Sequence, residues 1–262
     1  MYDGTPNQGM RAIRELLRRF EHEIEYKIFD VRRRAEVPGL DFDLYLSTGG
    51  PGNPNEGDGH WDKRYYEWMQ SVWDWNLLPG RAKKHVFFIC HSFQMAIKHF
   101  GLAQVTRRKS KSFGTFPCHK TKEGMMDIAL DGLPPVFYIA DFRDWQCVQP
   151  DRARLEEIGA KILALEKERP HVPLERAIMA VRFSDEFVGT QFHPEADPEG
   201  MLDHFMDPER RALIAEEHGE EKYLNMIEHL NDSDKIALTY EIVLPLFFFR
   251  AIRAVRNATA MA

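Results

Sequence analysis

The feature that most constrains the fold is the apolar run from His85 to Cys90, which residues compatible with a helix follow at once. A strand that is apolar along its whole length is typical of the interior of a parallel sheet, where helices cover both faces. The helical segment is expected from Ser92 to Phe100, and Gly101 ends it. The sequence therefore predicts a buried strand with Cys90 at its junction with a helix.

The rest of the chain alternates in the same way and predicts an α/β protein, with an open, mostly parallel sheet flanked by helices. From about Asp197 onward the pattern becomes wholly helical. We expect residues 1–200 to form the α/β domain and residues 201–262 to form a helical C-terminal extension packed on the same domain. The expected helices are 10–23, 155–168, 208–218, 221–230 and 233–256, and the other expected strands are 25–31, 42–47 and 136–141, with a hairpin formed by 177–183 and 187–192.

The first nine residues, Met1 to Gly9, are read as a loop that leads straight into a helix. A doubly wound sheet normally places a strand before such a loop. We therefore expect the sheet to be short by one strand, at the position preceding Met1.

The composition excludes several classes of protein. Lys plus Arg number 35 and Asp plus Glu number 41, so the net charge of −6 gives no basic field for nucleic-acid binding. The longest apolar run, 242–249, is interrupted by Pro245 and is far shorter than the roughly 20 residues that span a bilayer. Three scattered cysteines form no disulfide framework, and neither they nor the adjacent pair Cys118 and His119 have metal-ligand spacing. We expect a cytoplasmic protein with no metal and no cofactor.

Three features could carry chemistry together. Cys90 lies at a strand–helix junction, where the helix N-terminus favours the thiolate. The turn 49–52, Gly-Gly-Pro-Gly, also follows a strand, and its backbone N–H groups could form part of an oxyanion hole. His193 and Glu195 are two residues apart, so on an extended chain they point to the same side. Each feature alone is common in structural roles, but together they supply a nucleophile, a base and a group that orients the base.

The motifs around these residues resemble those of class I glutamine amidotransferases, the Cys-His-Glu type found in GMP synthase and its stand-alone relatives. The segment 46–52 resembles the family's Gly-Gly-Pro loop, 90–94 resembles its Cys-x-Gly-x-Gln nucleophile elbow, and 189–195 matches its Gly-x-Gln-Phe-His-Pro-Glu motif in full. The resemblance covers roughly residues 1 to 200. It implies a flavodoxin-like fold and a glutaminase that supplies ammonia for an amidotransferase reaction.

The resemblance also implies roles for individual residues. Cys90 would attack the carboxamide of glutamine, His193 would transfer protons, and Glu195 would orient His193. The N–H groups of Gly50 and His91 would form the oxyanion hole. The residues that would contact the substrate are Gly49, Gly52, Gln94, Phe113 and Gly114.

Two positions depart from the family pattern. Ser92 stands where the family has glycine in the elbow, and a side chain this small is expected to be accommodated. Asp141 and Arg143 stand near the family's Ser-His pair, which contacts the amino-acid head of glutamine. Asp141 could accept from an α-ammonium and Arg143 could pair with an α-carboxylate, or the two could form a surface ion pair.

This departure leaves alternatives open. The second hypothesis is a γ-glutamyl hydrolase that acts on a γ-glutamyl amine, and the third is a non-catalytic relative that binds a ligand or a protein. The sequence contains no recognisable synthetase segment, so an ammonia acceptor would lie on another chain. The aromatic stretch from Trp61 to Trp75 is expected to pack a helix, and the basic run 107–111 to be a solvated loop. Phe247 to Phe249 are expected to pack a C-terminal helix, although an exposed apolar stripe there could form a homodimer.

Overall fold

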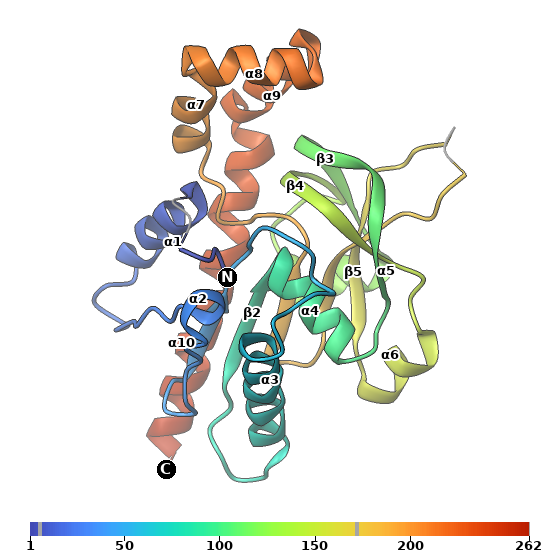
Figure 1. Ribbon diagram of the computed structural model, residues 1–262. Helices are drawn as coiled ribbons and strands as arrows, with labels where there is room; N and C mark the ends of the chain where they lie inside the picture. The colour runs from blue at the N-terminus through green and yellow to red at the C-terminus, as the bar shows by residue number, and fades with distance from the viewer. Residues whose placement is uncertain (5–6, 171–172, 262) are drawn as a thin grey trace.

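A computed structural model describes residues 1–4, 7–170 and 173–261, and within them one seven-stranded sheet has the order β1-β2-β7-β6-β5-β3-β4 (Figure 1). The predicted α/β class with a helical C-terminal part is confirmed. The sheet is mixed, however, because only β1–β2 and β2–β7 are parallel and the other four neighbouring pairs are antiparallel. Thr5 and Pro6 of the expected N-terminal loop lie outside the described residues.

The strands and helices have the following bounds. The strands are β1 Leu44–Ser47, β2 His85–Ile89, β3 Gln104–Lys120, β4 Val136–Val148, β5 Lys161–Glu166, β6 Ile178–Arg182 and β7 Phe187–Thr190. The helices are α1 Gln8–Arg18, α2 Val31–Arg34, α3 Trp61–Leu77, α4 His91–His99, α5 Lys122–Met126, α6 Arg152–Ile158, α7 Pro198–Met206, α8 Pro208–His218, α9 Glu220–Asn231 and α10 Leu238–Met261, with short helical turns at Ile128–Leu130 and Ser233–Ala237.

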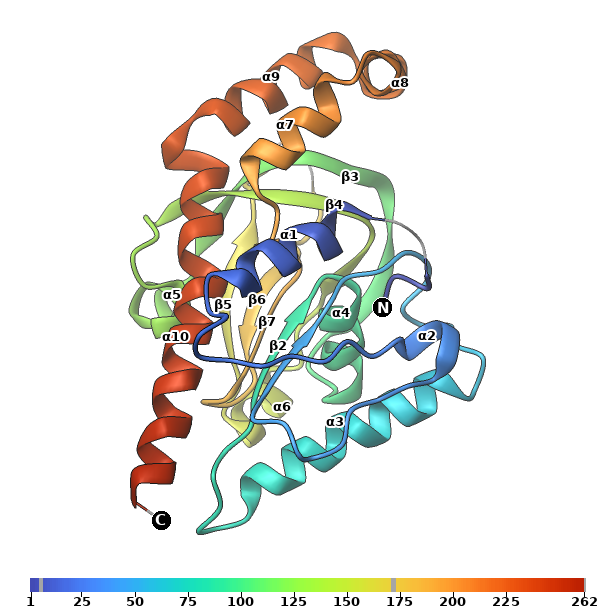
Figure 2. The ribbon, with the colours of Figure 1, turned by 90° about the vertical axis from the view of Figure 1, so that its left-hand side faces the viewer.

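Strand β2 is buried on both faces, as its apolar sequence predicts. Side chains alternate along a strand, so Val86 and Phe88 pack into the core layer that contains α3 and α4. Phe87 and Ile89 pack into the opposite layer, which contains α1 and α10. The sheet thus lies between two helical layers, and Figure 2 shows it from the side of α1 and α10. The aromatic stretch in α3 belongs to the first of these layers, as the packing interpretation predicts.

The helices after β7 contact the sheet in two places. Helices α7 and α9 pack with the outer part of the β3–β4 hairpin, where Phe205 and Met226 join the buried cluster around Ala140 (Figure 1). Helix α10 runs along the opposite layer, and its Phe248 ring lies 5.3 Å from the ring of Phe20. No helix among the described residues is long and apolar enough to cross a membrane.

Two neighbouring phenylalanines of α10 give a test of this packing. Phe248 is 3% exposed and Phe249 is 58% exposed. Because a buried phenylalanine leaves a cavity when truncated, Phe248→Ala is expected to lower the free energy of unfolding by about 3 to 5 kcal/mol. Phe249→Ala is the matched control and is expected to cost less than about 0.5 kcal/mol. Urea unfolding measures both, and equal losses would contradict the docking of α10 on the sheet.

Several local predictions were wrong. The expected strand 25–31 is an extended segment without strand pairing, followed by α2. The expected helix 155–168 ends at Ile158, because Gly159 adopts a left-handed φ of 73° as its C-cap, and β5 begins two residues later. The basic run 107–111 is not a solvated loop but part of β3, which pairs with β4 from Gln104 to His119 around a bulge.

Candidate active site

Cys90 occupies a sharp turn between β2 and α4. Its φ of 50° and ψ of −101° lie outside the regions that non-glycine residues favour, so the backbone at this residue is strained. The next residue, His91, begins α4, which places Cys90 at the N-cap of a nine-residue helix. This is the strand–helix junction that the sequence predicts, and it sets the thiol at the carboxyl edge of the parallel strands.

Ser92 is accommodated in the elbow through hydrogen bonds. Its hydroxyl oxygen accepts from the N–H of Ile89 at 2.9 Å, and the hydroxyl is 2.7 Å from the carbonyl of Ser47. Ser47 ends β1 and Ile89 ends β2, so the serine connects the carboxyl ends of two strands. A glycine at this position could not form these side-chain hydrogen bonds.

His193 and Glu195 lie just beyond the end of β7. The N–H of His193 donates to the carbonyl of Ala140 at 3.0 Å, which ties the segment to β4. The Nδ1 atom of His193 is 2.8 Å from Oε1 of Glu195, whose side chain is 1% exposed. Burial opposes the charged imidazole, but the negative charges of Glu195 and Cys90 outweigh it and raise the pKa of His193 well above its usual value.

The structure brings these residues and Gly49 together. The negative charge of Cys90 is among the causes that raise the pKa of His193, so the two side chains are close enough to interact. A Cβ atom built on Gly49 would lie 3.0 Å from Cε1 of His193 and 3.3 Å from Cβ of Cys90. Any side chain at position 49 would therefore press on the nucleophile and the base at once. Glycine leaves their contact undisturbed.

The two expected oxyanion donors are unpaired. Among the described residues, the backbone N–H groups of Gly50 and His91 donate no hydrogen bond. Gly50 packs against the backbone of Met1, because a Cβ at position 50 would be 2.3 Å from the Met1 carbonyl oxygen. The His91 side chain is buried, which, with the nearby charges of Arg32 and the chain's amino group, lowers its pKa to about 3. The imidazole of His91 is therefore neutral. Position 52 requires glycine for a different reason, because its φ of 95° is a backbone conformation that other residues rarely adopt.

A glutamine beneath the nucleophile was not predicted as a site residue. The side-chain amide of Gln191 points its nitrogen at Cys90 Sγ, 3.7 Å away. Gln94 donates to the Gln191 oxygen at 3.0 Å and to the Trp145 carbonyl at 3.2 Å. Gln94 is 3% exposed, so in this structure it supports Gln191 from inside the protein. The motif around 189–195 contained Gln191, and its place beside His193 was the available signal.

Phe113 and Gly114 lie on β3, opposite Phe142 and Asp141 of β4. The Phe113 ring stacks on His218 at 4.4 Å and meets the Phe142 ring at 5.1 Å. The Phe142 ring in turn lies 6.1 Å from the His193 ring, so a series of ring contacts joins His218 to the base. Gly114 has a φ of 130°, and a Cβ there would be 3.1 Å from Sδ of Met226. Gly114 thus permits α9 to pack on the hairpin.

Asp141 and Arg143 form a buried ion pair. The Arg143 Nε donates to Asp141 Oδ1 at 2.8 Å, and Arg143 Nη2 is 3.4 Å from Glu166 Oε1. Arg108 from the basic run completes the cluster, 2.9 Å from the same Glu166 oxygen. Side chains of all four are at most 8% exposed, so the pair is not on the surface. The negative charge of Asp141 and of Glu166 is balanced within the cluster.

Tyr2 was also not predicted as a site residue. Burial, followed by the negative charges of Glu195 and Cys90, raises the pKa of the Tyr2 phenol well above its usual value. A Cβ on Gly9 would lie 2.1 Å from the Tyr2 hydroxyl oxygen, so glycine at position 9 makes room for it. The second carboxylate oxygen of Glu195, Oε2, is buried without a hydrogen bond among the described residues. A hydrogen bond with the Glu195 side chain is a further cause of the raised pKa of Tyr2, so the phenol lies near this carboxylate. An N-terminal loop carries no periodic pattern that could have revealed this.

This arrangement gives a prediction for Tyr2. A hydrogen bond to the Glu195 carboxylate helps to hold the carboxylate against His193, so Tyr2→Phe is expected to lower kcat by about 3- to 10-fold. The matched control is Tyr26→Phe, because Tyr26 is 53% exposed. Steady-state kinetics measure both variants. Unchanged kcat in Tyr2→Phe would exclude the phenol from positioning Glu195.

Among the described residues, no group of three or more His, Cys, Asp or Glu side chains could hold a metal ion. The three thiols are all free and buried. What the site offers is therefore a strained cysteine, a histidine with a raised pKa, a carboxylate and two unpaired backbone donors.

Comparison with known proteins points to one family. The family model for glutamine amidotransferase class I matches residues 7–207. A glutamine amidotransferase from Thermotoga maritima has a TM-score of 0.66 at 15% identity, covering 92% of this chain and 91% of that one. A protein from Thermoplasma acidophilum assigned as part of a GMP synthase has a TM-score of 0.52 at 20% identity, covering 74% of this chain and 82% of that one.

The glutaminase domain of Trypanosoma brucei CTPS with bound acivicin is similar as well. Its TM-score is 0.50 at 17% identity, covering 73% of this chain and 84% of that one. Identities this low show a shared fold. No curated protein sequence matches the chain.

Proposed function

The chain belongs to the class I glutamine amidotransferase family, and from this premise we propose that it hydrolyses the side-chain amide of glutamine with Cys90 as the nucleophile. The observation that carries the proposal is the contact of three side chains at the ends of neighbouring strands. Cys90 and His193 both lie against Gly49, and Nδ1 of His193 is 2.8 Å from Glu195. That geometry supplies a nucleophile, a proton donor and an orienting carboxylate.

The first half of the reaction forms a thioester. The Cys90 thiolate attacks the carboxamide carbon, and the carbonyl oxygen becomes an oxyanion. The unpaired N–H groups of Gly50 and His91 are the donors proposed to stabilise it. The raised pKa of His193 keeps a proton on its ring, and His193 gives this proton to the departing nitrogen. The C–N bond breaks and ammonia leaves.

The second half releases glutamate. His193, now neutral, accepts a proton from a water molecule that attacks the thioester carbon. The C–S bond breaks, the thiolate returns, and the His193 proton is again available. Glu195 holds Nδ1 of the ring at 2.8 Å throughout, so Nε2 faces the reacting atoms. The side-chain nitrogen of Gln191 donates a hydrogen bond to Cys90 Sγ at 3.7 Å and so helps to hold the sulfur in position.

We further propose that the ammonia serves a synthetase or other acceptor on another chain. Low glutaminase activity in the absence of the partner would avoid the release of ammonia that no acceptor can use. The partner would complete the oxyanion hole, and the three glycines at positions 49, 50 and 52 give the loop the freedom to reorient. The chain alone is therefore expected to be a weak glutaminase. A partner that completes one oxyanion donor is expected to raise turnover by about 100- to 1000-fold, and glutaminase assays with and without cell extract measure this. Rapid hydrolysis that no extract changes would contradict delivery to a partner.

A second candidate is a γ-glutamyl hydrolase. The buried cluster around Asp141 and Arg143 commits both side chains to protein partners, so neither residue distinguishes glutamine from a γ-glutamyl amine, and this candidate stays open. The γ-linked amide chemistry is the same, but the group on the amide nitrogen differs.

One screen separates the candidates. The purified chain and its Cys90→Ala variant are given glutamine and a set of γ-glutamyl amines, and release of glutamate is measured. Cys90-dependent release from glutamine supports the glutaminase. Preferential release from a γ-glutamyl amine supports the second candidate. No Cys90-dependent release from any of them would favour a non-catalytic binding protein.

A further inference from the structure

A guanidinium without a carboxylate partner lies beside the loop 49–52. Arg32 is the second residue of α2, and its neighbour Arg34 pairs with Glu36 at 3.8 Å on the surface. Arg32 itself forms no ion pair among the described residues, and its Nε atom is buried there without a hydrogen bond. A buried polar atom without a partner is rare in folded proteins and requires an explanation. The hydrogen bonds that Arg32 does make lead to the loop and to Met1.

Arg32 holds one peptide group of the loop. Its Nη1 atom donates a hydrogen bond to the carbonyl oxygen of Pro51, and a longer one, of 3.4 Å, to the carbonyl oxygen of Met1. Because a peptide group is planar, the bond to Pro51 fixes the whole peptide group that joins Pro51 to Gly52. Gly52 also lies against the guanidinium, since a Cβ built there would be 3.3 Å from Nη2 of Arg32. Arg32 therefore holds the loop on the side that follows Gly50.

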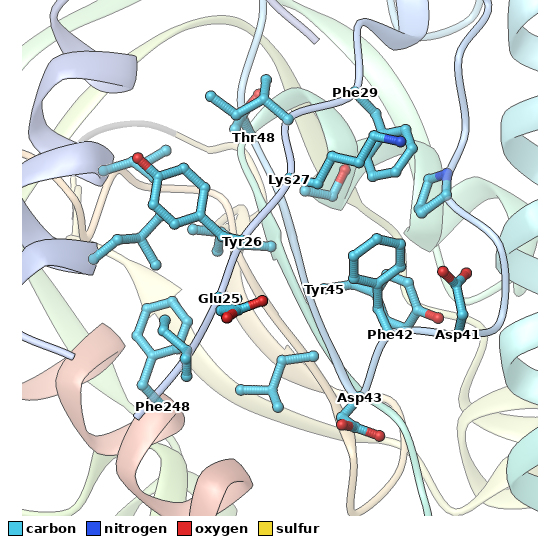
Figure 3. A pocket seen from close by; sticks show the side chains of 18 of the residues that line it. Glu25, Tyr26, Lys27, Phe29, Asp41, Phe42, Asp43, Tyr45, Thr48 and Phe248 are labelled. Carbon is cyan, nitrogen blue, oxygen red and sulfur yellow. The ribbon is translucent and has the colours of Figure 1, made fainter. Parts of the chain in front are cut away.

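Thr48 holds the loop on the side that precedes Gly50. Its hydroxyl donates to the carbonyl oxygen of Gly49 at 3.0 Å. In a trans peptide the C=O and N–H groups point in opposite directions, so this bond also fixes the direction of the Gly50 N–H. Thr48 follows β1 and lies beyond Tyr45 along the chain, at one end of the pocket in Figure 3. The Gly50 N–H thus belongs to a peptide group that Thr48 holds, two peptide groups before the one that Arg32 holds.

Arg32 is itself held in place by α3. Its guanidinium carbon lies 5.3 Å from the centre of the Trp61 ring, a distance at which a cation and an aromatic ring attract each other. Trp61 is the first residue of α3 and is 6% exposed, so its ring is fixed within the core layer that contains α3 and α4. The contact restricts a side chain that would otherwise have many rotamers. The guanidinium therefore reaches Pro51 from a rigid part of the fold.

The same guanidinium lies near the second proposed oxyanion donor. The side chain of His91 is 1% exposed, and its Nε2 atom is buried without a hydrogen bond among the described residues. After burial, the positive charge of Arg32 is the largest cause that lowers the pKa of this imidazole to about 3. Arg32 thus lies near both backbone N–H groups, those of Gly50 and His91, and its charge favours the negative charge that would develop between them.

We propose that Arg32 is a positioning residue, which holds the loop 49–52 in the conformation that keeps the Gly50 N–H available to the oxyanion. The three glycines of the loop permit several backbone conformations, and the hydrogen bond to Pro51 stabilises one of them. The proposal rests on the proposed function, because it concerns a donor for that reaction. Arg32 acts through the loop and needs no contact with the substrate.

Steady-state glutamine hydrolysis tests this role. Arg32→Met removes the guanidinium and keeps a long side chain. It is expected to lower kcat by about 10- to 100-fold, because the oxyanion donor is displaced but not removed. KM is expected to change by less than about 2-fold, since the lost interaction is made in the transition state. Arg32→Lys keeps a positive charge and one donor and is expected to recover part of kcat. Arg34→Met is the matched control on the exposed side of the same helix and is expected to leave kcat unchanged.

Two further measurements do not depend on glutamine hydrolysis. NMR relaxation gives the amide order parameters of Gly50 and Gly52, which are expected to be about 0.85 in the native chain and below about 0.6 in Arg32→Met. Alkylation of Cys90 by iodoacetamide needs no oxyanion hole, so its rate is expected to change by less than about 3-fold. If no form of the chain releases glutamate while the order parameters differ as expected, the proposed function fails and the holding of the loop by Arg32 stands.

Four results would overturn the proposal. In the first, Arg32→Met and Arg34→Met have the same kcat. In the second, the order parameters of the two glycines are the same in the native chain and in Arg32→Met. In the third, Arg32→Met raises kcat, which would mean that Arg32 holds the loop away from its productive conformation. In the fourth, alkylation of Cys90 slows as much as kcat falls, which would assign the effect to the nucleophile. If Arg32→Met does not fold, Arg32→Lys is compared with Arg34→Lys by the same measurements.

Discussion

Replacing Cys90 by serine is expected to reduce glutamine hydrolysis by about 10⁴-fold or more, because a much less acidic hydroxyl replaces the thiol proposed as the nucleophile. The matched control is Cys118→Ser, whose thiol is equally buried but lies 3.4 Å from the carbonyl of Leu165 on β5. That variant is expected to keep nearly full activity. Steady-state glutamate release measures both. Similar losses in the two variants would remove Cys90 from the role of nucleophile.

Chemical labelling tests the same residue without substitution. Burial raises the pKa of the Cys118 and Cys147 thiols, so both stay protonated and unreactive near neutral pH. A glutamine-like electrophile is expected to modify Cys90 and to spare the other two, as read by mass spectrometry of peptides. Equal labelling of all three, or none at Cys90, would count against the assignment.

Replacing Glu195 by glutamine is expected to lower kcat by about 10⁴-fold, because an amide no longer fixes the ring orientation or stabilises the imidazolium. Glu199, in the first turn of α7, offers a matched control, since Glu199→Gln makes the same change four residues away and outside the triad. We expect Glu199→Gln to retain activity.

The pH profile separates the two functions of Glu195. The folded pKa of His193 lies above its usual value, so the imidazolium is present below that raised pKa and is lost as the pH rises through it. Removing the Glu195 charge lowers the pKa of His193. The alkaline limb of kcat in Glu195→Gln is therefore expected to move to lower pH by about one unit or more. An unmoved limb together with a lower kcat would indicate that Glu195 only orients the ring.

The centre of the fold was predictable from the sequence. Strand β2 is apolar along its length, which predicted a buried strand. The hairpin of β6 and β7 has apolar strands on either side of a polar turn, and this pattern predicted both strands and the turn. The elbow at Cys90 and the pair of His193 and Glu195 follow from these elements, because each lies one to five residues beyond a strand that was correctly placed.

The periphery was not predictable for a physical reason. The Lys- and Arg-rich part of β3 lies where its pairing with β4 is interrupted, between Arg107 and Ser112, and the buried Arg108 finds Glu166 only in the folded protein. No local pattern encodes a partner 58 residues away. Asp141 and Arg143 were misjudged in the same way, since their burial depends on that cluster. Tyr2 reaches Glu195 through tertiary packing of a loop.

The residues proposed as catalytic follow two paired strands, whereas part of their surroundings comes from the two ends of the chain. Cys90 follows β2 and His193 follows β7, two paired neighbours, while Tyr2 and α7–α9 belong to the first and last parts of the sequence. Mutations in either end can therefore change the surroundings of the site while β2 and β7 still hold Cys90 and His193 in place. The strand ends that carry Cys90 and His193 and the terminal segments around them can therefore change independently in evolution.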